Sequence, residues 1–136
     1  LAKVYFSAGY DFCHLVGEFP SGLDTTVFTA ECLEKTWNEA KKRSEREHIT
    51  PYMTNNPNLF KIGAYAPLHG LYHHRWVVDH PEDYEFAKAV YRGLEQLGDA
   101  FRWEDIFKFL EQRPEVFALN SEIKRDEGYL KSVAQD

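Results

Sequence analysis

Apolar and polar residues alternate along this chain at two different periods, which predict short strands interspersed with helices. Apolar residues that recur every three or four positions indicate helices, whereas alternation at every second position indicates half-buried strands. The predicted strands cover Tyr10–Leu15, Leu23–Phe28, Phe60–Tyr65 and Leu71–Asp79. The predicted helices cover Leu1–Ala8, a segment after the capping residue Thr29, a short or kinked segment from Ser44 to Asn55, Pro81 to near Gly98, Trp103–Leu110 and Ile123–Val133.

Some predicted strands follow each other directly in the sequence, and others are separated by helices. Strict strand–helix–strand alternation would favour an all-parallel sheet, whereas adjacent strands favour a mixed one. We therefore expect an α/β fold with a mixed sheet flanked by helices, formed by residues 1–136 as a single unit. The helix after Thr29 is expected to bury Leu33, Trp37 and Ala40, which share one face.

The pattern changes abruptly at Asp79. Before it, Trp76–Val78 forms a continuous apolar run of the kind found in strands covered on both faces, and after it Pro81 stands where a helix would begin. Ligands in α/β sheets bind at such strand ends, and a carboxylate there could hold Mg²⁺ together with substrate phosphates. Alternatively, Asp79 simply caps the helix that begins at Pro81.

Two other segments carry candidate polar groups. Ser44–His48 places acids, a guanidinium and an imidazole within one helical turn, which could bind hydroxyls or phosphates, or could be a capping box at a helix start. Asp24 stands between a turn and a strand, where a role in the turn is the default interpretation. Zinc is disfavoured because no Cys or HExxH pattern accompanies the four histidines of the central region, His69, His73, His74 and His80.

Composition narrows the class of protein. A chain of 136 residues with 43% hydrophobic residues can fill a substantial core, and its net charge of −6 argues against generic nucleic-acid binding. No apolar run approaches the roughly 18 residues that span a membrane. Cys13 and Cys32 lie in apolar surroundings without metal-ligand spacing, so a cytoplasmic location with free thiols is expected. Because the chain begins at Leu1, we also expect an N-terminal portion to precede it.

Four ordered motifs resemble the C-terminal half of the spore coat polysaccharide biosynthesis protein F family, which is similar to the CMP-KDO synthetases and acylneuraminate cytidylyltransferases. The resemblance covers nearly the whole chain. Its motifs are Gly22–Phe28, Ser44–Tyr52, His74–Asp83 and Glu127–Leu130. The chain departs from the family at His80, where Thr is usual, and in a shorter Cys13–Pro20 segment. The family's glycine-rich nucleotide loop and first metal-binding Asp have no match here.

The resemblance implies the C-terminal part of a nucleotide-diphospho-sugar transferase fold and transfer of CMP from CTP to a sugar-like acceptor with release of pyrophosphate. It implies Mg²⁺ as cofactor, with Asp79 as the catalytic, metal-binding carboxylate. Asp24, Glu47 and His48 would fall near the sugar pocket. Arg75 would contact an anionic substrate group or pair internally with an acid. This chain alone would then be catalytically incomplete, and formation of a homodimer stays open.

Two alternative interpretations belong to other classes. The absent N-terminal motifs, together with the aromatic-rich helix Trp103–Leu110, would suit a non-catalytic α+β interaction or dimerisation module. A glycosyltransferase of related fold would instead use a nucleotide-sugar donor. A glycine-rich loop with Arg and Lys in the reading frame upstream of Leu1 would favour the nucleotidyltransferase.

Overall fold

The computed structural model describes residues 7–136, apart from the side chain of Asp99. Its packing divides these residues into two compact units. Unit 1 contains residues 7–19, 24–69 and 124–136, and unit 2 contains residues 20–23 and 70–123. Most of the helix predicted over residues 1–8 lies outside the described residues. Ser7 and Ala8 are helical, and Gly9 follows them with a positive φ of 58°.

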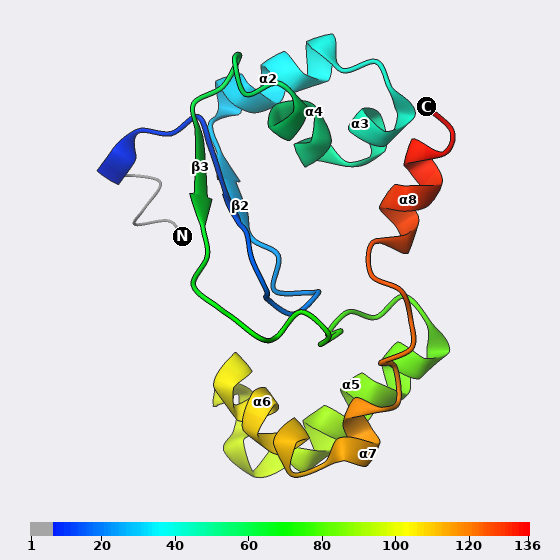
Figure 1. The fold of residues 1–136 in the computed structure, drawn as a ribbon. Helices are drawn as coiled ribbons and strands as arrows, with labels where there is room; N and C mark the ends of the chain where they lie inside the picture. The colour runs from blue at the N-terminus through cyan, green and yellow to red at the C-terminus, as the bar shows by residue number, and fades with distance from the viewer. Residues whose placement is uncertain (1–6) are drawn as a thin grey trace. The chain divides into compact units, whose positions relative to one another are not determined.

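Unit 1 is built on a three-stranded sheet in the order β2-β1-β3 (Figure 1). Strand β1 (Phe12–Leu15) pairs antiparallel with β2 (Thr26–Phe28) and parallel with β3 (Ile62–Tyr65). The predicted mixed α/β sheet with flanking helices is therefore confirmed. The predicted strand before residue 28 is shorter than expected, because residues 23–25 are not paired as strand.

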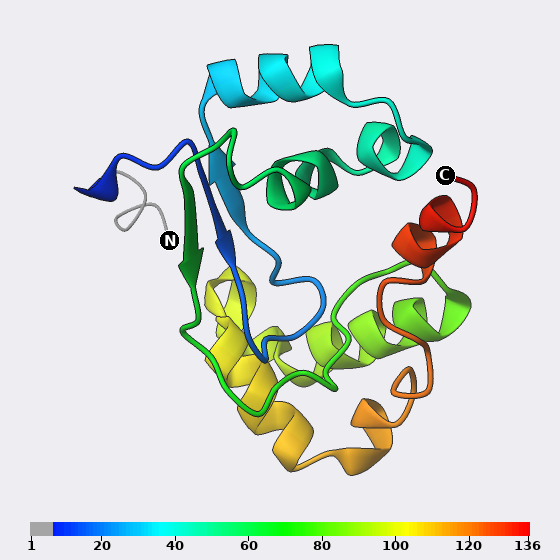
Figure 2. The same ribbon diagram turned by 45° about the horizontal axis from the view of Figure 1, so that its top comes forward.

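One row of side chains across this sheet forms the floor of the unit 1 core. Phe12 lies opposite Phe28 on one side and Ile62 on the other, so the three side chains share one face. Helices α2 (Ala30–Glu39) and α4 (Ile49–Asn55), with the α2 C-cap residue Ala40 and Phe60 before β3, provide the rest of the core (Figure 2). The buried members of this cluster are Phe12, Cys32, Ala40, Tyr52, Met53 and Phe60.

Helix α2 confirms the predicted cap and corrects the predicted buried face. The Thr29 hydroxyl accepts a hydrogen bond from the Cys32 amide at 3.0 Å, as an N-cap should. However, Trp37 is 65% exposed, and the buried face consists of Cys32, Thr36 and Ala40. The Thr36 hydroxyl donates to the Cys32 carbonyl, so this polar residue is satisfied inside the core. The Arg46 guanidinium lies over the Trp37 ring, 4.0 Å from the ring centroid.

The predicted helix after Ser44 is split in two. Helix α3 (Arg43–Glu47) and α4 are separated at His48, whose backbone is extended, and Asn55 ends the second helix as expected. The predicted capping box is wrong, because Glu45, not Glu47, accepts from the amide of the N-cap residue Lys42. The Ser44 hydroxyl is buried and donates to Asp136 at 2.6 Å, a partner supplied by the distant end of the chain.

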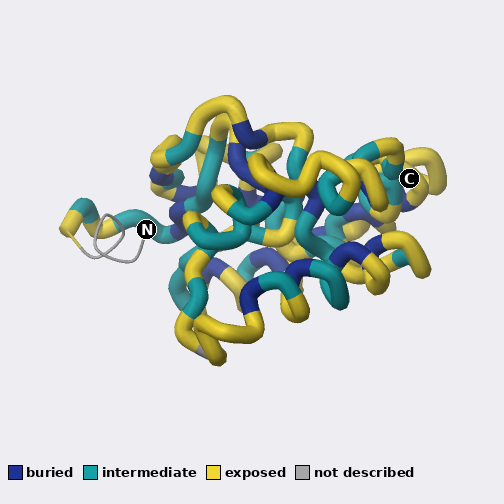
Figure 3. The backbone as a smooth tube through the Cα atoms, turned by 90° about the horizontal axis from the view of Figure 1, so that it is seen from below, coloured by how far each residue is buried: buried dark blue, intermediate teal, exposed yellow. Residues whose placement is uncertain are grey.

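Unit 2 is helical. It contains α5 (Pro81–Gly93), a 3₁₀ segment η1 (Glu95–Ala100), α6 (Trp103–Glu111) and the single turn α7 (Pro114–Phe117). Phe86, Val90 and Leu94 form its core together with Leu110, and Trp76 packs against them. Buried positions recur between exposed ones along such helices, as Figure 3 shows for the whole described backbone. The helix predicted from Pro81 ends five residues earlier than expected.

The strand predicted over Leu71–Asp79 is wrong. Within the described residues this segment contains no strand, and its only sheet-like pairing is an isolated bridge between Arg75 and Ser21. The apolar run before Asp79 covers helix side chains instead of lying between strands: Trp76 packs on the α5 and α6 core, while Val78 is 60% exposed. A short apolar run by itself does not distinguish these two environments.

The aromatic residues of α6 are not exposed. Ile106 and Phe109 pack against the core of unit 2, and Phe107 contacts the ring of His74. Trp103, Phe107 and Phe109 all have intermediate burial. Of the two observations that favoured an interaction module, the exposure of this helix is therefore contradicted.

Gly22 provides a test of the contact between residues 20–23 and 74–76. Its φ is +102°, and a Cβ there would lie 2.2 Å from the Trp76 carbonyl oxygen. Gly22→Ala is therefore expected to lower the free energy of unfolding by more than about 2 kcal/mol, because it adds a backbone clash to an unfavourable φ. Chemical denaturation of both proteins measures the difference.

Gly70→Ala is the matched control. Gly70 also has a positive φ, +73°, but a Cβ there meets nothing within 4 Å. Its cost should be limited to backbone strain of about 1 kcal/mol. Equal losses in the two variants would show that the close approach of Gly22 to Trp76 does not matter for stability.

Candidate functional site

Arg75 and Asp83 form a buried ion pair in unit 2. The Arg75 Nε donates to Asp83 Oδ1 at 2.9 Å, and the Arg75 Nη2 donates to Asp83 Oδ2 at 2.8 Å. Arg75 is 8% exposed and Asp83 is fully buried. This bidentate geometry is the strongest that a guanidinium and a carboxylate can adopt. Arg75 therefore holds an internal acid, one of the two roles open to it from the sequence.

Asp83 also caps helix α5. Its Oδ2 accepts hydrogen bonds from the backbone amides of Asp79 and His80 at 3.1 and 3.0 Å. The N-cap residue is His80, so the alternative in which Asp79 caps this helix is wrong. Asn120, which is also buried, donates its side-chain amide to Asp83 Oδ1 at 2.8 Å and to the Arg75 carbonyl at 3.0 Å.

These contacts keep Asp83 ionised in spite of its burial. Burial alone would raise the pKa of Asp83, but hydrogen bonds from Arg75, Asn120 and the two backbone amides outweigh it and hold the pKa well below its usual range. The hydrogen bonds to Asp83 in turn raise the pKa of Arg75. Both partners therefore carry full charge over the physiological pH range, and every oxygen lone pair of Asp83 faces a donor.

The depressed pKa of Asp83 predicts acid sensitivity. The unfolded chain takes up a proton on this carboxyl near pH 4, whereas the folded chain does so only at lower pH. The stabilisation by Asp83 should therefore be fully present above about pH 5 and be lost as the pH falls through the folded-state pKa. Denaturant unfolding measured from about pH 7 downward should show this decline. A stability independent of pH below about pH 4 would contradict it.

Asp79 has a different environment from Asp83. Its side chain is 68% exposed, and its Oδ2 accepts from Arg75 Nη2 at 3.2 Å. Arg75 thus joins the buried carboxylate to the exposed one. Among Arg75, Asp83 and Asn120, only Arg75 contacts the Asp79 side chain. The Asp79 carboxylate therefore retains capacity to accept a hydrogen bond from a ligand or to bind a cation.

Glu47 and His48 meet in unit 1 at a serine that sequence reasoning missed. Ser132 lies on α8 (Glu127–Val133) and is 3% exposed. Its Oγ donates to Glu47 Oε2 at 2.8 Å and lies 3.3 Å from His48 Nε2. The hydrogen bond from Ser132 is the main reason that the pKa of Glu47 is lowered, with Arg43 and His48 contributing further. Glu47 is therefore an anionic acceptor.

The order of these three side chains is not that of a Ser-His-acid catalytic triad. In a Ser-His-acid triad the histidine lies between the other two and takes the serine proton. Here the serine lies between the histidine and the acid, and its proton points to Glu47. A donor, an acceptor and an imidazole so arranged suit the binding of hydroxyl groups.

Asp24 also contacts the end of the chain. Its Oδ1 lies 3.9 Å from Arg125 Nη2, and the Asp24 side chain is 64% exposed. Arg125 is held by a hydrogen bond of 2.8 Å to the Phe19 carbonyl, and its guanidinium lies over the Phe19 ring at 5.0 Å. Asp24 therefore belongs to a charged surface of unit 1 that includes the start of α8.

The five residues predicted from the sequence thus form two groups. Arg75 and Asp79 touch in unit 2, whereas Asp24, Glu47 and His48 contact residues 125–132 in unit 1. Sequence reasoning missed Asp83, Asn120, Arg125 and Ser132. Asp83 follows the N-cap residue by three positions, as acidic capping residues do, and could have been found. Nothing local indicates the contact of Asn120 with Asp83, 37 positions away, or that of Ser132 with Glu47, 85 positions away.

Among residues 7–136, no group of three or more His, Cys, Asp or Glu side chains is placed to hold a metal ion. Asp83 is saturated by hydrogen bonds, so of the two acids beside Arg75 only Asp79 could be a ligand. This fits Mg²⁺, which commonly binds one or two carboxylates and completes its coordination with phosphate oxygens and water. In the same range of residues, no helix has both the length and the apolar character needed to cross a membrane.

Comparison with known proteins identifies two similar chains. A solved cytidylyltransferase from Leptospira borgpetersenii serovar Hardjo-bovis superposes with a TM-score of 0.74 and 27% identity, over 90% of this chain and 51% of that one. The uncharacterized protein MJ1063 of Methanocaldococcus jannaschii is 33% identical over 106 residues, which are 76% of this chain and 43% of the relative. No protein-family model matches. The chain therefore has a cytidylyltransferase-like fold and spans about half the length of these relatives.

Proposed function

We propose that this chain is the C-terminal part of a nucleotidyltransferase that transfers CMP from CTP to a sugar-like acceptor for surface or spore polysaccharide synthesis. The observation that carries the proposal is the similarity of its fold to the Leptospira cytidylyltransferase over 90% of the chain. The ordered resemblance to spore coat polysaccharide biosynthesis protein F supports the finer assignment. The activity belongs to the longer polypeptide, since this chain spans 51% of the solved enzyme.

The reaction joins an acceptor oxygen to the α-phosphorus of CTP. The bond from that phosphorus to the bridging oxygen of the β-phosphate breaks, pyrophosphate leaves, and the proton of the acceptor hydroxyl passes to a base or to water. Catalysis of such a step consists mainly of positioning and of stabilising the charge on the phosphates. When bound, Mg²⁺ would supply most of that charge stabilisation.

Asp79 is the residue of this chain that we assign to the metal. Its exposed carboxylate has room for a cation, and the buried Arg75–Asp83 pair fixes the backbone that carries it. Glu47 and His48 provide acceptors for sugar hydroxyls in unit 1, and Asp24 adds a further carboxylate beside Arg125.

The test uses the longest polypeptide encoded by the reading frame that contains this chain. Isothermal titration with CTP, with and without Mg²⁺, measures binding, and release of pyrophosphate is followed with a panel of acidic and amino sugars. We expect CTP to bind more tightly with Mg²⁺ than ATP, GTP or UTP does, and chelation by EDTA to abolish turnover. Failure to bind any nucleotide and to release pyrophosphate with every acceptor would overturn the proposal.

A further inference from the structure

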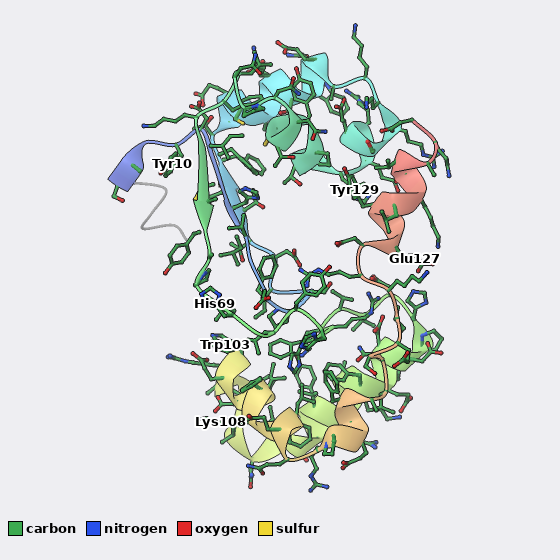
Figure 4. The ribbon with its side chains drawn as sticks, viewed as in Figure 1. Tyr10, His69, Trp103, Lys108, Glu127 and Tyr129 are labelled. Carbon is green, nitrogen blue, oxygen red and sulfur yellow. The ribbon has the colours of Figure 1, made fainter. Side chains whose placement is uncertain are left out.

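The segment Arg125–Ser132 contacts all three acceptor-site candidates of unit 1. Arg125 lies against Asp24, and Ser132 lies between Glu47 and His48. The three candidates come from separate places: the approach to β2, the last residue of α3, and the junction of α3 with α4. Helix α8 packs directly on α3, as Figures 1 and 4 show, and Figure 4 places Glu127 and Tyr129 on it.

The hydrogen bonds of Ser132 can be assigned from its single hydroxyl proton. Three groups surround its Oγ: Glu47 Oε2 at 2.8 Å, the Gly128 carbonyl at 3.1 Å and His48 Nε2 at 3.3 Å. A hydroxyl donates one hydrogen bond and accepts up to two. The carboxylate is the nearest acceptor and carries a charge, so it receives the proton. Any other assignment would place the Ser132 oxygen and the Glu47 oxygen together without a proton between them.

This assignment determines the role of His48. Because the Ser132 proton is given to Glu47, the contact with His48 requires a hydrogen on Nε2, which donates to the serine oxygen. In the neutral imidazole the other nitrogen, Nδ1, is then the acceptor. The ring is also restrained by Tyr129, which meets it edge to face with centroids 5.6 Å apart. The same Glu47 oxygen, Oε2, also lies 3.6 Å from Arg43 Nε.

We propose that Ser132 is a positioning residue of the acceptor site: its hydroxyl holds His48 in the Nε2–H tautomer, so that Nδ1 accepts a hydrogen bond from a hydroxyl of the sugar-like acceptor. The identity of the acceptor rests on the proposed function, whereas the tautomer does not. Ser132 itself takes no part in bond making or breaking. It acts through His48 and Glu47.

Nitrogen-15 NMR of the 136-residue chain tests the tautomer directly. Proton-coupled spectra at about pH 8, where an ordinary histidine is neutral, distinguish the ring nitrogen that bears hydrogen from the one that does not. For His48 the hydrogen is expected on Nε2. Replacing Ser132 by Ala should change the tautomer ratio of His48 by about fivefold, the effect of losing one ordinary hydrogen bond. A hydrogen on Nδ1 in the wild-type chain would overturn the proposal, as would an unchanged ratio in S132A.

Two further variants separate positioning from loss of structure. Ser132→Thr keeps the hydroxyl and should restore the wild-type tautomer ratio. Lys131→Ala removes the neighbouring side chain, whose ammonium pairs with Glu127 at 2.9 Å on the surface of the same helix, and should leave the His48 signals unchanged. If K131A shifts the His48 ratio as much as S132A does, the effect comes from the helix and the assignment to Ser132 fails.

Kinetics of the longer polypeptide test the second part of the proposal. Ser132→Ala is expected to raise the KM for the acceptor by about fivefold and to leave the KM for CTP unchanged, because only the acceptor hydroxyl meets His48. An unchanged acceptor KM together with a shifted tautomer ratio would overturn the link to the acceptor. If the polypeptide transfers no nucleotide at all, the proposed function fails while the NMR result still decides the role of Ser132 in holding His48.

Discussion

Replacing Asp83 by Asn is expected to lower the free energy of unfolding by about 3–5 kcal/mol, because it leaves the Arg75 guanidinium buried without its counter-charge. The substitution also turns one acceptor oxygen of Asp83 into a donor, which cannot serve the donors that now face it: Arg75, Asn120 and the amides of Asp79 and His80. Chemical denaturation followed by tryptophan fluorescence measures the loss, since Trp76 packs on the same helical core.

Asp79→Asn is the matched control for stability. Asp79 pairs with the same Arg75 nitrogen as Asp83 does, but its side chain is 68% exposed. Exposed ion pairs contribute about 0–1 kcal/mol, so this variant should unfold close to the wild-type denaturant concentration. A loss as large as that of D83N would mean that the exposed acid, and not the buried one, anchors Arg75.

Asp79→Asn is also expected to reduce nucleotidyl transfer by the longer polypeptide at least about 100-fold while the fold stays intact. Loss of the carboxylate removes the metal ligand that we assign to this chain, whereas the amide keeps the shape of the side chain. Pyrophosphate release at saturating CTP and Mg²⁺ measures the effect.

Glu82→Gln provides the control for local charge. Glu82 is an exposed acid in the first turn of α5, three residues from Asp79, and its replacement removes the same charge. It should change turnover by less than about twofold, because a surface charge of this kind is largely screened by solvent and salt. Full activity of D79N would show that Asp79 has no part in the mechanism. Equal losses of turnover in D79N and E82Q would show that Asp79 acts only through its negative charge and not as a metal ligand.

The resemblance to spore coat polysaccharide biosynthesis protein F pointed to residues whose chemistry local pattern left open. Local pattern favoured a cap for Asp79, yet Asp83 is the residue that caps α5 and Asp79 remains exposed. The same pattern treated Glu47 and His48 as parts of a helix start, yet both turn toward Ser132. Asp79 therefore does not cap α5, whereas His48 is the N-cap residue of α4 and also contacts Ser132.

The elements that depend on neighbours along the chain were predictable from the amino-acid sequence. The cap at Thr29, the end of α4 at Asn55, the start of α5 at Pro81 and the mixed sheet all follow from periodicity, proline and capping chemistry, which act over a few residues.

The environment of the candidate residues depends on tertiary packing and could not be predicted from local pattern. Trp76 covers a helical core instead of joining a sheet, Asp83 is buried by Arg75 and Asn120, and Ser132 lies between Glu47 and His48. These contacts join positions 8 to 85 residues apart. No local propensity encodes them, because burial and hydrogen-bond pairing across such separations depend on how whole elements pack.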